Sequence, residues 1–186
     1  MATTQVLHEK PMIDGAVLRR MIETRRDLHR HPELSWKEER TPALICGYLD
    51  RLGVSYHRPL ATGVVADLPG PAGVPIVALR GDIDALPIEE ETGLPFASAT
   101  PGVMHACGHD GHTSMLLGAT EALLRMEDRP APIRLIFQPA EEVGAGAKAL
   151  VEAGVLDGVG MIFGGHLDRR FAPGLSLIHI SEPTRL

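Results

Sequence analysis

The sequence has 186 residues, of which 44% are hydrophobic, and a net charge of −6 from 18 basic and 24 acidic residues. This length and composition fit one globular domain, or most of one. The charges are mixed without a basic stripe, which argues against nucleic-acid binding, and no apolar run is long enough to cross a membrane. Met1 to Pro11 lacks the apolar stretch of a secretory signal, and two cysteines cannot form a disulfide framework. We therefore expect a cytoplasmic protein whose thiols stay reduced.

The first fifty residues predict two helices. Asp14 is a candidate N-cap for a helix that ends near His31, because the residue before a proline disfavours helical conformation. Two starts are equally good for the second helix. Ser35 with Glu38 has the spacing of a capping box, and the Thr-Pro pair at 41–42 puts a proline at the first helical position.

The rest of the chain alternates between apolar runs and helical patterns. Strands are predicted at 54–57, 63–68, 75–80, 133–137 and 159–163, and helices at 110–126 and 145–153. The run at 75–80 is continuously apolar, as a strand buried on both faces requires. This alternation predicts an α/β fold.

The most informative motif is the octet at 105–112, His-Ala-Cys-Gly-His-Asp-Gly-His. It is followed by the pair Glu141-Glu142 and then by His166. Thiolate, imidazole and carboxylate together are the ligand set of a hydrolytic metal site. Three separate segments offer such ligands, so the pattern is far more specific than a lone Cys-x-His.

Most of these residues follow predicted strands. Asp82 and Asp84 end the first buried strand, Glu141-Glu142 follows the next, and His166 follows the last. In open α/β sheets, ligands bind at the carboxyl ends of the strands. We therefore expect these side chains to meet the octet at one edge of the sheet, with Asp82, Asp84 and His112 supporting the ligands.

Each residue also has a simpler interpretation. Cys107 alone would more often be a buried structural thiol, and His112 could be an ordinary histidine at a helix start. His29 and His31 are expected to be helix-end residues, and His105 to be structural. Two further classes of protein stay open: a cysteine-nucleophile hydrolase or redox-sensing thiol protein, and a non-catalytic fold stabilised by a metal. The first of these gives Glu141-Glu142 and His166 no role.

Five stretches carry a resemblance to a known family. They are residues 25–34 (Arg-Arg-Asp-Leu-His-Arg-His-Pro-Glu-Leu), 79–88 (Leu-Arg-Gly-Asp-Ile-Asp-Ala-Leu-Pro-Ile), 104–112, 137–142 (Phe-Gln-Pro-Ala-Glu-Glu) and 165–166 (Gly-His). The chain resembles the metal-dependent amidohydrolases and carboxypeptidases that include hippurate hydrolase, N-acyl-amino-acid deacylases and auxin-conjugate hydrolases. The resemblance implies a three-layer αβα sandwich with a mostly parallel mixed sheet, forming the N-terminal part of a di-metal exopeptidase-like catalytic domain.

The same resemblance implies the roles of the site residues. The family's two-metal site corresponds to Cys107, His109, Glu142 and His166, and its catalytic carboxylate corresponds to Glu141. The implied cofactors are two divalent ions per complete subunit, manganese or zinc, with cobalt and nickel as further candidates. The implied substrate is a small N-acyl amino acid of the hippurate type, hydrolysed by a metal-activated water with a glutamate as general base.

The resemblance also bears on the length of the chain. The family's last metal ligand is a histidine far downstream, and its second domain is a lid through which a full-length protein would form homo-oligomers. Neither is present here. We therefore expect residues 1–174 to be the N-terminal portion of the catalytic metal-binding domain, inactive alone. Residues 175–186 depart from the family pattern and resemble translated sequencing-adapter read-through, so His179 is not expected to be a metal ligand.

Overall fold

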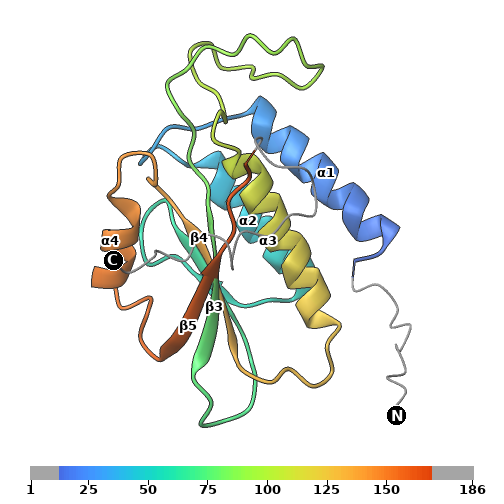
Figure 1. Cartoon of the computed structure of the whole chain (residues 1–186), viewed down its shortest axis with the longest axis vertical. Coiled ribbons are helices and arrows are strands. Elements are labelled where there is room, and N and C mark those ends of the chain that lie inside the picture. Colours follow the sequence, from blue (N-terminus) through green and yellow to red (C-terminus); the bar gives the residue numbers. More distant parts are fainter. Residues whose placement is uncertain (1–12, 169–186) are drawn as a thin grey trace, which may run out of the picture.

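Residues 13–168 are the part of the chain that this computed structural model describes (Figure 1). Two helices come first, three strands follow, and helices and strands then alternate. The helices are α1 (Gly15–Arg30), α2 (Arg40–Leu52), α3 (His109–Leu124) and α4 (Gly146–Glu152), and the strands are β1 (Tyr56–His57), β2 (Val64–Leu68), β3 (Ile76–Asp82), β4 (Ile133–Gln138) and β5 (Val159–Gly164). The expectations for residues 169–186, and thus for the tail at 175–186, lie outside the described residues.

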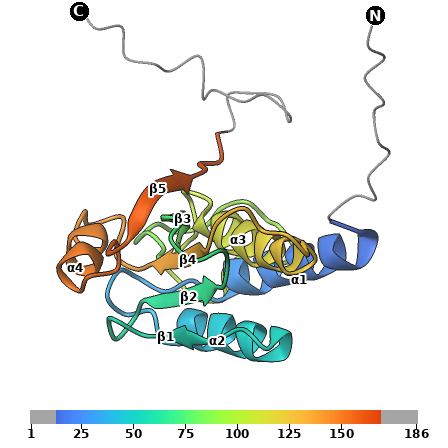
Figure 2. The ribbon, with the colours of Figure 1, turned by 90° about the horizontal axis from the view of Figure 1, so that it is seen from below.

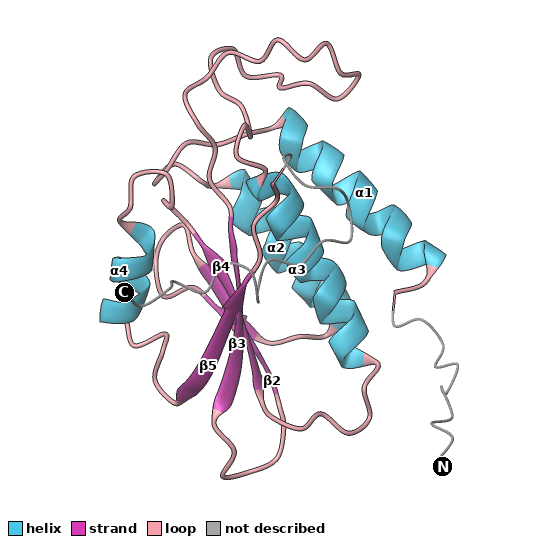
Figure 3. Cartoon of the chain, in the orientation of Figure 1, coloured by secondary structure: helices cyan, strands magenta, loops and turns pink. Residues whose placement is uncertain are grey.

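The five strands form one mixed sheet, drawn in magenta in Figure 3. Their order is β1-β2-β4-β3-β5. Strand β3 is parallel to both β4 and β5, whereas β2 is antiparallel to β4 and to β1. In the parallel pair, Asp82 is in register with Gln138, so β3 and β4 end at the same edge of the sheet. The predicted α/β fold with a mixed sheet is confirmed.

Helices cover the two faces of the sheet unequally. Helices α2 and α3 pack on one face, with α1 against α3, and the short α4 lies on the other (Figure 2). The larger core lies between α2, α3 and the sheet, and its fully buried members include Ile45, Leu49, Ile83, Leu135 and Phe137. A smaller cluster around Ile136 and Leu150 lies under α4. The three-layer arrangement is thus present, with its helices concentrated on one side.

Strand β5 is the most exposed part of the sheet. It lies at the sheet edge beside β3, and its Met161, Ile162 and Phe163 are 55%, 50% and 43% exposed. An apolar strand with an unpaired edge is a template for pairing with another strand. Among the described residues, no helix is both long and apolar enough to span a bilayer.

The two N-terminal helices begin in different ways. Asp14 caps α1 as predicted, since its Oδ1 accepts the backbone N–H groups of residues 16 and 17 at 2.8 and 2.9 Å. Helix α2 begins at Arg40, next to the predicted Thr-Pro start, and the capping box at Ser35 and Glu38 is wrong. Instead, the Glu33 carboxylate accepts the N–H groups of residues 39, 40 and 41 at 2.7–2.9 Å. Ser35 and Glu38 are therefore free to make contacts elsewhere.

Candidate metal centre

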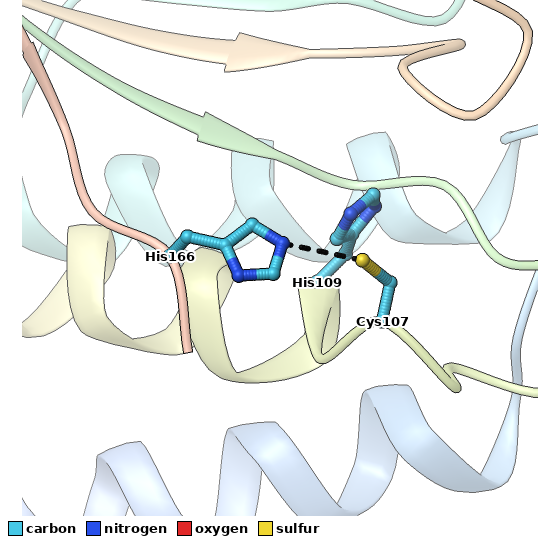
Figure 4. Close-up of side chains that lie close together, drawn as sticks. All are labelled: Cys107, His109 and His166. Carbon is cyan, nitrogen blue, oxygen red and sulfur yellow. Dashed lines mark hydrogen bonds between the residues drawn. The ribbon is translucent and has the colours of Figure 1, made fainter. Parts of the chain in front are cut away.

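The predicted ligands meet at the edge of the sheet where β3 and β4 end. The Cys107 thiol lies 3.3 Å from Nε2 of His166, and both face His109 (Figure 4). Nε2 of His109 lies 3.6 Å from a carboxylate oxygen of Glu142 and 3.8 Å from one of Glu141. His109 is thus close enough to Cys107 and His166 to share a metal ion with them, and it is also close enough to share one with the two glutamates.

Local sequence explains how the octet presents its side chains. Gly108 is the residue before α3 and has φ of 89°, a left-handed conformation that favours glycine. This turn leaves Cys107 in the preceding loop and makes His109 the first residue of the helix. His109 is only 1% exposed, whereas His166 follows β5 on the exposed side of the site.

Asp84 orients His109. Its Oδ1 lies 3.3 Å from Nδ1 of His109, which places the ring proton on Nδ1 and leaves the lone pair on Nε2, facing the glutamates. The other oxygen of Asp84 accepts the Ser35 hydroxyl at 2.7 Å and the Glu142 N–H at 3.0 Å. Burial alone raises the pKa of Asp84, but these hydrogen bonds outweigh it and hold the pKa at about 2. Asp84 is therefore an anion that fixes one ligand candidate and the backbone of another.

A left-handed residue precedes the two glutamates. Ala140 has φ of 50°, a conformation that costs a non-glycine residue ~1–3 kcal/mol. Consecutive side chains of a strand point to opposite faces, but the chain turns here, and Glu141 and Glu142 both reach His109. The glutamates differ in exposure, since the Glu141 side chain is 38% exposed and that of Glu142 is 16% exposed.

Asp82 and His112 brace the segment that carries His166. Nδ1 of His112 lies 2.6 Å from Asp82, and its Nε2 accepts the Leu167 N–H at 2.9 Å. Both ring nitrogens of His112 are therefore engaged, which fits a supporting role and not that of a ligand. Nδ1 of His166 donates to the Leu167 carbonyl at 2.8 Å, so its Nε2 keeps the lone pair beside Cys107.

Negative charge accumulates around this site. Burial lowers the pKa of His109, but the hydrogen bond with Asp84 and the nearby carboxylates outweigh it and raise the pKa overall. Burial and the neighbouring carboxylates, Glu142 first among them, raise the pKa of the Cys107 thiol to about 11. Nucleophilic and redox-sensing cysteines have lowered pKa values in electropositive surroundings. These surroundings therefore disfavour the thiol-nucleophile alternative and favour a bound cation.

Two atoms of the site are buried without a hydrogen-bond partner. They are Nε2 of His109 and one carboxylate oxygen of Glu142. Such buried polar atoms are costly unless they are paired or bind a metal. Sulfur, nitrogen and oxygen donors lie in neighbouring groups that share His109, and this donor set fits a divalent cation such as zinc. The residues present therefore fit a metal ion.

A cavity of about 740 Å³ adjoins the site. Cys107 and His166 form part of its wall together with apolar side chains of Leu94, Met104 and Leu167. Cavities of this size commonly bind small molecules. The long segment between β3 and α3, which extends beyond the strand ends in Figure 1, contributes part of this wall.

A second polar network lies beside the octet and was not predicted. His29 was expected to be an ordinary helix-end residue, but it is buried and lies 2.9 Å from Asp110 and 3.1 Å from Glu90. Asp110 also accepts a hydrogen bond from Arg25 at 3.1 Å. The network ties α1 to the start of α3. His105 is buried nearby, and burial lowers its pKa to about 4.

Comparison with known proteins places this fold and site in a family. Residues 78–186 match the model of peptidase family M20/M25/M40. The chain is 49% identical over 158 residues to N-acetylcysteine deacetylase of Bacillus subtilis, covering 83% of this chain and 42% of that protein. It is also 49% identical over 155 residues to IAA-amino acid hydrolase ILR1-like 5 of Arabidopsis thaliana, covering 83% of this chain and 36% of the relative. The chain therefore belongs to peptidase family M20/M25/M40, as the sequence motifs predicted.

Solved structures agree with this assignment. The crystal structure of the Bacillus subtilis YXEP protein, described as a dinuclear metal binding peptidase from the M20 family, superposes with a TM-score of 0.80 at 48% identity. That match covers 83% of this chain and 44% of the other. N-acyl-L-amino acid amidohydrolase of Geobacillus stearothermophilus is 49% identical over 150 residues, covering 79% of this chain and 40% of that protein. The chain thus spans less than half the length of these relatives.

Proposed function

We propose that this chain is the metal-binding part of an amidohydrolase that cleaves the amide bond of N-acyl amino acids. The observation that carries the proposal is a pair of buried atoms, Nε2 of His109 and a carboxylate oxygen of Glu142, which face each other at 3.6 Å without a hydrogen bond. His109 also lies beside the Cys107 thiol and His166. The relatives named as N-acetylcysteine deacetylase and N-acyl-L-amino acid amidohydrolase support this substrate class.

The proposed ligands of the metal site are Cys107, His109, Glu142 and His166. Divalent ions held there, manganese or zinc being the first candidates, would supply an activated water and a Lewis acid for the amide carbonyl. The reducing cytoplasm that we expect for this protein keeps Cys107 available as a ligand. Asp84 holds the lone pair of His109 toward this centre, and His112 holds the segment of His166 through the Leu167 N–H.

Glu141 is the proposed general base. Its carboxylate is more exposed than that of Glu142 and lies 3.8 Å from Nε2 of His109, so it borders the centre without being enclosed by it. A carboxylate in that position accepts a proton from water on its oxygen and then delivers it to the leaving amide nitrogen. The adjoining cavity, walled partly by Leu94 and Met104, is the proposed site for the apolar part of a hippurate-like substrate.

The test measures metal content and hydrolysis of a panel of N-acyl amino acids, including N-acetylcysteine and hippurate. Both the 186-residue chain and a version extended to the length of the relatives are assayed. Divalent metal that is lost on mutation of Cys107 or His109, with hydrolysis by the extended chain, supports the proposal. Hydrolysis that survives metal removal and is abolished by a thiol reagent would instead favour a cysteine nucleophile. Bound metal without turnover in the extended chain would favour a metal-stabilised fold.

A further inference from the structure

Glu38 is a buried carboxyl group whose role is not explained by the helix beside it. It lies in the segment between α1 and α2 and has 0% exposure. Its spacing from Ser35 suggests a capping box, but α2 begins at Arg40 and the carboxylate at its start belongs to Glu33. Burying a carboxyl group is unfavourable unless it makes compensating contacts. Glu38 therefore needs a partner outside its own segment.

That partner is the backbone immediately before the two glutamates of the site. Oε1 of Glu38 accepts the N–H of Ala140 at 2.9 Å, a contact between residues 102 positions apart. Ala140 is the residue with the left-handed φ of 50°, and it is fully buried. The hydrogen bond of Glu38 is thus made to the residue at which the chain leaves strand geometry.

The turn that begins at Ala140 is tightly closed. The N–H of Gly144 donates to the Glu141 carbonyl at 2.7 Å, and the N–H of Gly146 donates to the Ala140 carbonyl at 3.1 Å. A Cβ at position 146 would lie 1.6 Å from the Pro139 carbonyl oxygen, so only glycine fits there. Because the turn is closed, a hydrogen bond that fixes Ala140 also fixes the directions of the two side chains that follow.

The same segment reaches the glutamate pair by a second path. Ser35 donates to Asp84 at 2.7 Å, and Asp84 accepts the N–H of Glu142 at 3.0 Å. Residues 33–41 therefore hold the backbone at two points, before the pair at Ala140 through Glu38 and within the pair at the Glu142 N–H through Ser35 and Asp84. Neither Ser35 nor Glu38 belongs to the candidate ligand groups.

We propose that Glu38 is a positioning residue that holds the Ala140 turn so that Glu141 and Glu142 both face His109. The inference rests on the proposed function, because the expected losses follow from Glu142 as a metal ligand and Glu141 as the general base. Without the Glu38 acceptor, the backbone of Ala140 relaxes and Glu142 no longer meets His109 in a fixed geometry. The outcome is weaker metal binding, together with slower proton transfer by Glu141 in the extended chain.

The test compares substitutions that keep or remove the acceptor. Glu38→Gln keeps an oxygen of the same reach for the Ala140 N–H, whereas Glu38→Ala removes it. Glu38→Asp shortens the side chain by one methylene group and serves the same comparison if the alanine variant does not fold. Glu121→Ala is the matched control, because Glu121 is another buried carboxylate, bonded to Arg20 and Tyr48 on the helical side of the molecule.

Two properties are measured on the folded variants: the affinity for Zn²⁺ and the hydrogen exchange rate of the Ala140 amide. We expect faster exchange at Ala140 and a 10- to 100-fold loss of Zn²⁺ affinity for Glu38→Ala or Glu38→Asp, a loss typical of groups that support metal ligands. Glu38→Gln should restore both properties. Glu121→Ala should lower thermal stability while leaving Zn²⁺ affinity within the error of the wild type.

The outcomes separate the two proposals. Unchanged exchange at Ala140 in Glu38→Ala and Glu38→Asp, or a Glu38→Gln variant as impaired as they are, overturns the positioning role of Glu38. Zn²⁺ affinity that depends on Glu142 but not on Glu38 overturns that role as well, and it leaves the proposed function standing. If the wild-type chain binds no divalent metal, the proposed function fails. The exchange rate of Ala140 still decides whether Glu38 holds the turn.

Discussion

Replacing Asp84 with asparagine should change which nitrogen of His109 carries the proton. In the wild type, the Asp84 carboxylate accepts from Nδ1 of His109 on one oxygen, and from Ser35 and the Glu142 N–H on the other. Asparagine keeps the shape but offers one oxygen and one NH₂ group. The oxygen should stay with Ser35 and Glu142, because the reverse orientation would leave the partly buried Glu142 N–H facing a donor, at a cost of up to ~1–3 kcal/mol.

The NH₂ group of the substituted side chain then faces Nδ1 of His109 and donates to it. The ring proton moves to Nε2, which is the atom that faces Glu141 and Glu142 without a hydrogen-bond partner. A protonated nitrogen has no lone pair for a metal. Loss of such support typically costs 10- to 100-fold in metal affinity, or ~1.4–2.8 kcal/mol. The free energy of unfolding should fall by less than this, because the substitution only replaces a charge-assisted hydrogen bond with a neutral one.

Calorimetric titration with Zn²⁺ measures the affinity, and ¹⁵N NMR of the imidazoles reports the tautomer of His109. Asp67→Asn is the control, since Asp67 pairs with Arg134 at 2.8 Å and has a half-exposed side chain on β2 away from the site. An Asp84→Asn chain that is folded, has the proton of His109 on Nε2 and still binds Zn²⁺ as tightly as the wild type would refute this reasoning. An equal loss of Zn²⁺ affinity in the Asp67→Asn control would show that removing any negative charge has this effect.

The site and the core allow three further predictions. In a chain extended to the length of the relatives, Glu141→Gln should keep its metal and lose turnover by ~10²-fold or more, whereas Glu142→Gln should lose metal; equal metal loss in both contradicts the division of roles. The hydrogen bond with Asp110 raises the pKa of His29 above its ordinary 6.5. The stability that this hydrogen bond contributes is therefore complete below pH 6.5 and is lost as the pH rises through the folded-state pKa of His29. Urea denaturation should accordingly show that the difference in free energy of unfolding between wild type and His29→Gln shrinks with rising pH. A difference that stays constant with pH contradicts this prediction. Leu49 is fully buried, so Leu49→Ala should lower the free energy of unfolding by ~2–5 kcal/mol, and a loss under ~1 kcal/mol would show that the core there tolerates a cavity.

Sequence patterns predicted the elements whose signals are local. Asp14 caps α1 as its position suggested, and α2 begins next to the predicted Thr-Pro start. The strands before Asp84 and Glu141 were recognisable because both are short apolar runs. Their shared edge follows from parallel pairing, which is a general property of α/β sheets. For these reasons the approximate place of the site was predictable.

The contacts that orient the site residues were not predictable in this way. Ser35 and Glu38 have the spacing of a local capping box, but their partners lie 49 and 102 residues away. The sequence around His29 indicated only a residue at a helix end. Its acidic partners could not be predicted, because they are Asp110 at the start of α3 and Glu90. A single sequence records which side chains can form hydrogen bonds, but not which distant segments the fold brings beside them. The roles assigned to the ligand candidates and to Glu141 stay predictions until they are tested.

The candidate ligands come from three segments that are far apart in the sequence: the start of α3 with the loop before it, the turn after β4 and the residues after β5. An ion bound by all three would act as a cross-link that exists only in the folded state. At a free metal concentration 100 times the dissociation constant, such a ligand adds about 2.7 kcal/mol to the free energy of unfolding. That amount is a substantial part of the stability of an ordinary domain. The lifetime of this protein in a cell would then depend on the supply of metal, because metal starvation would raise the fraction of unfolded chains.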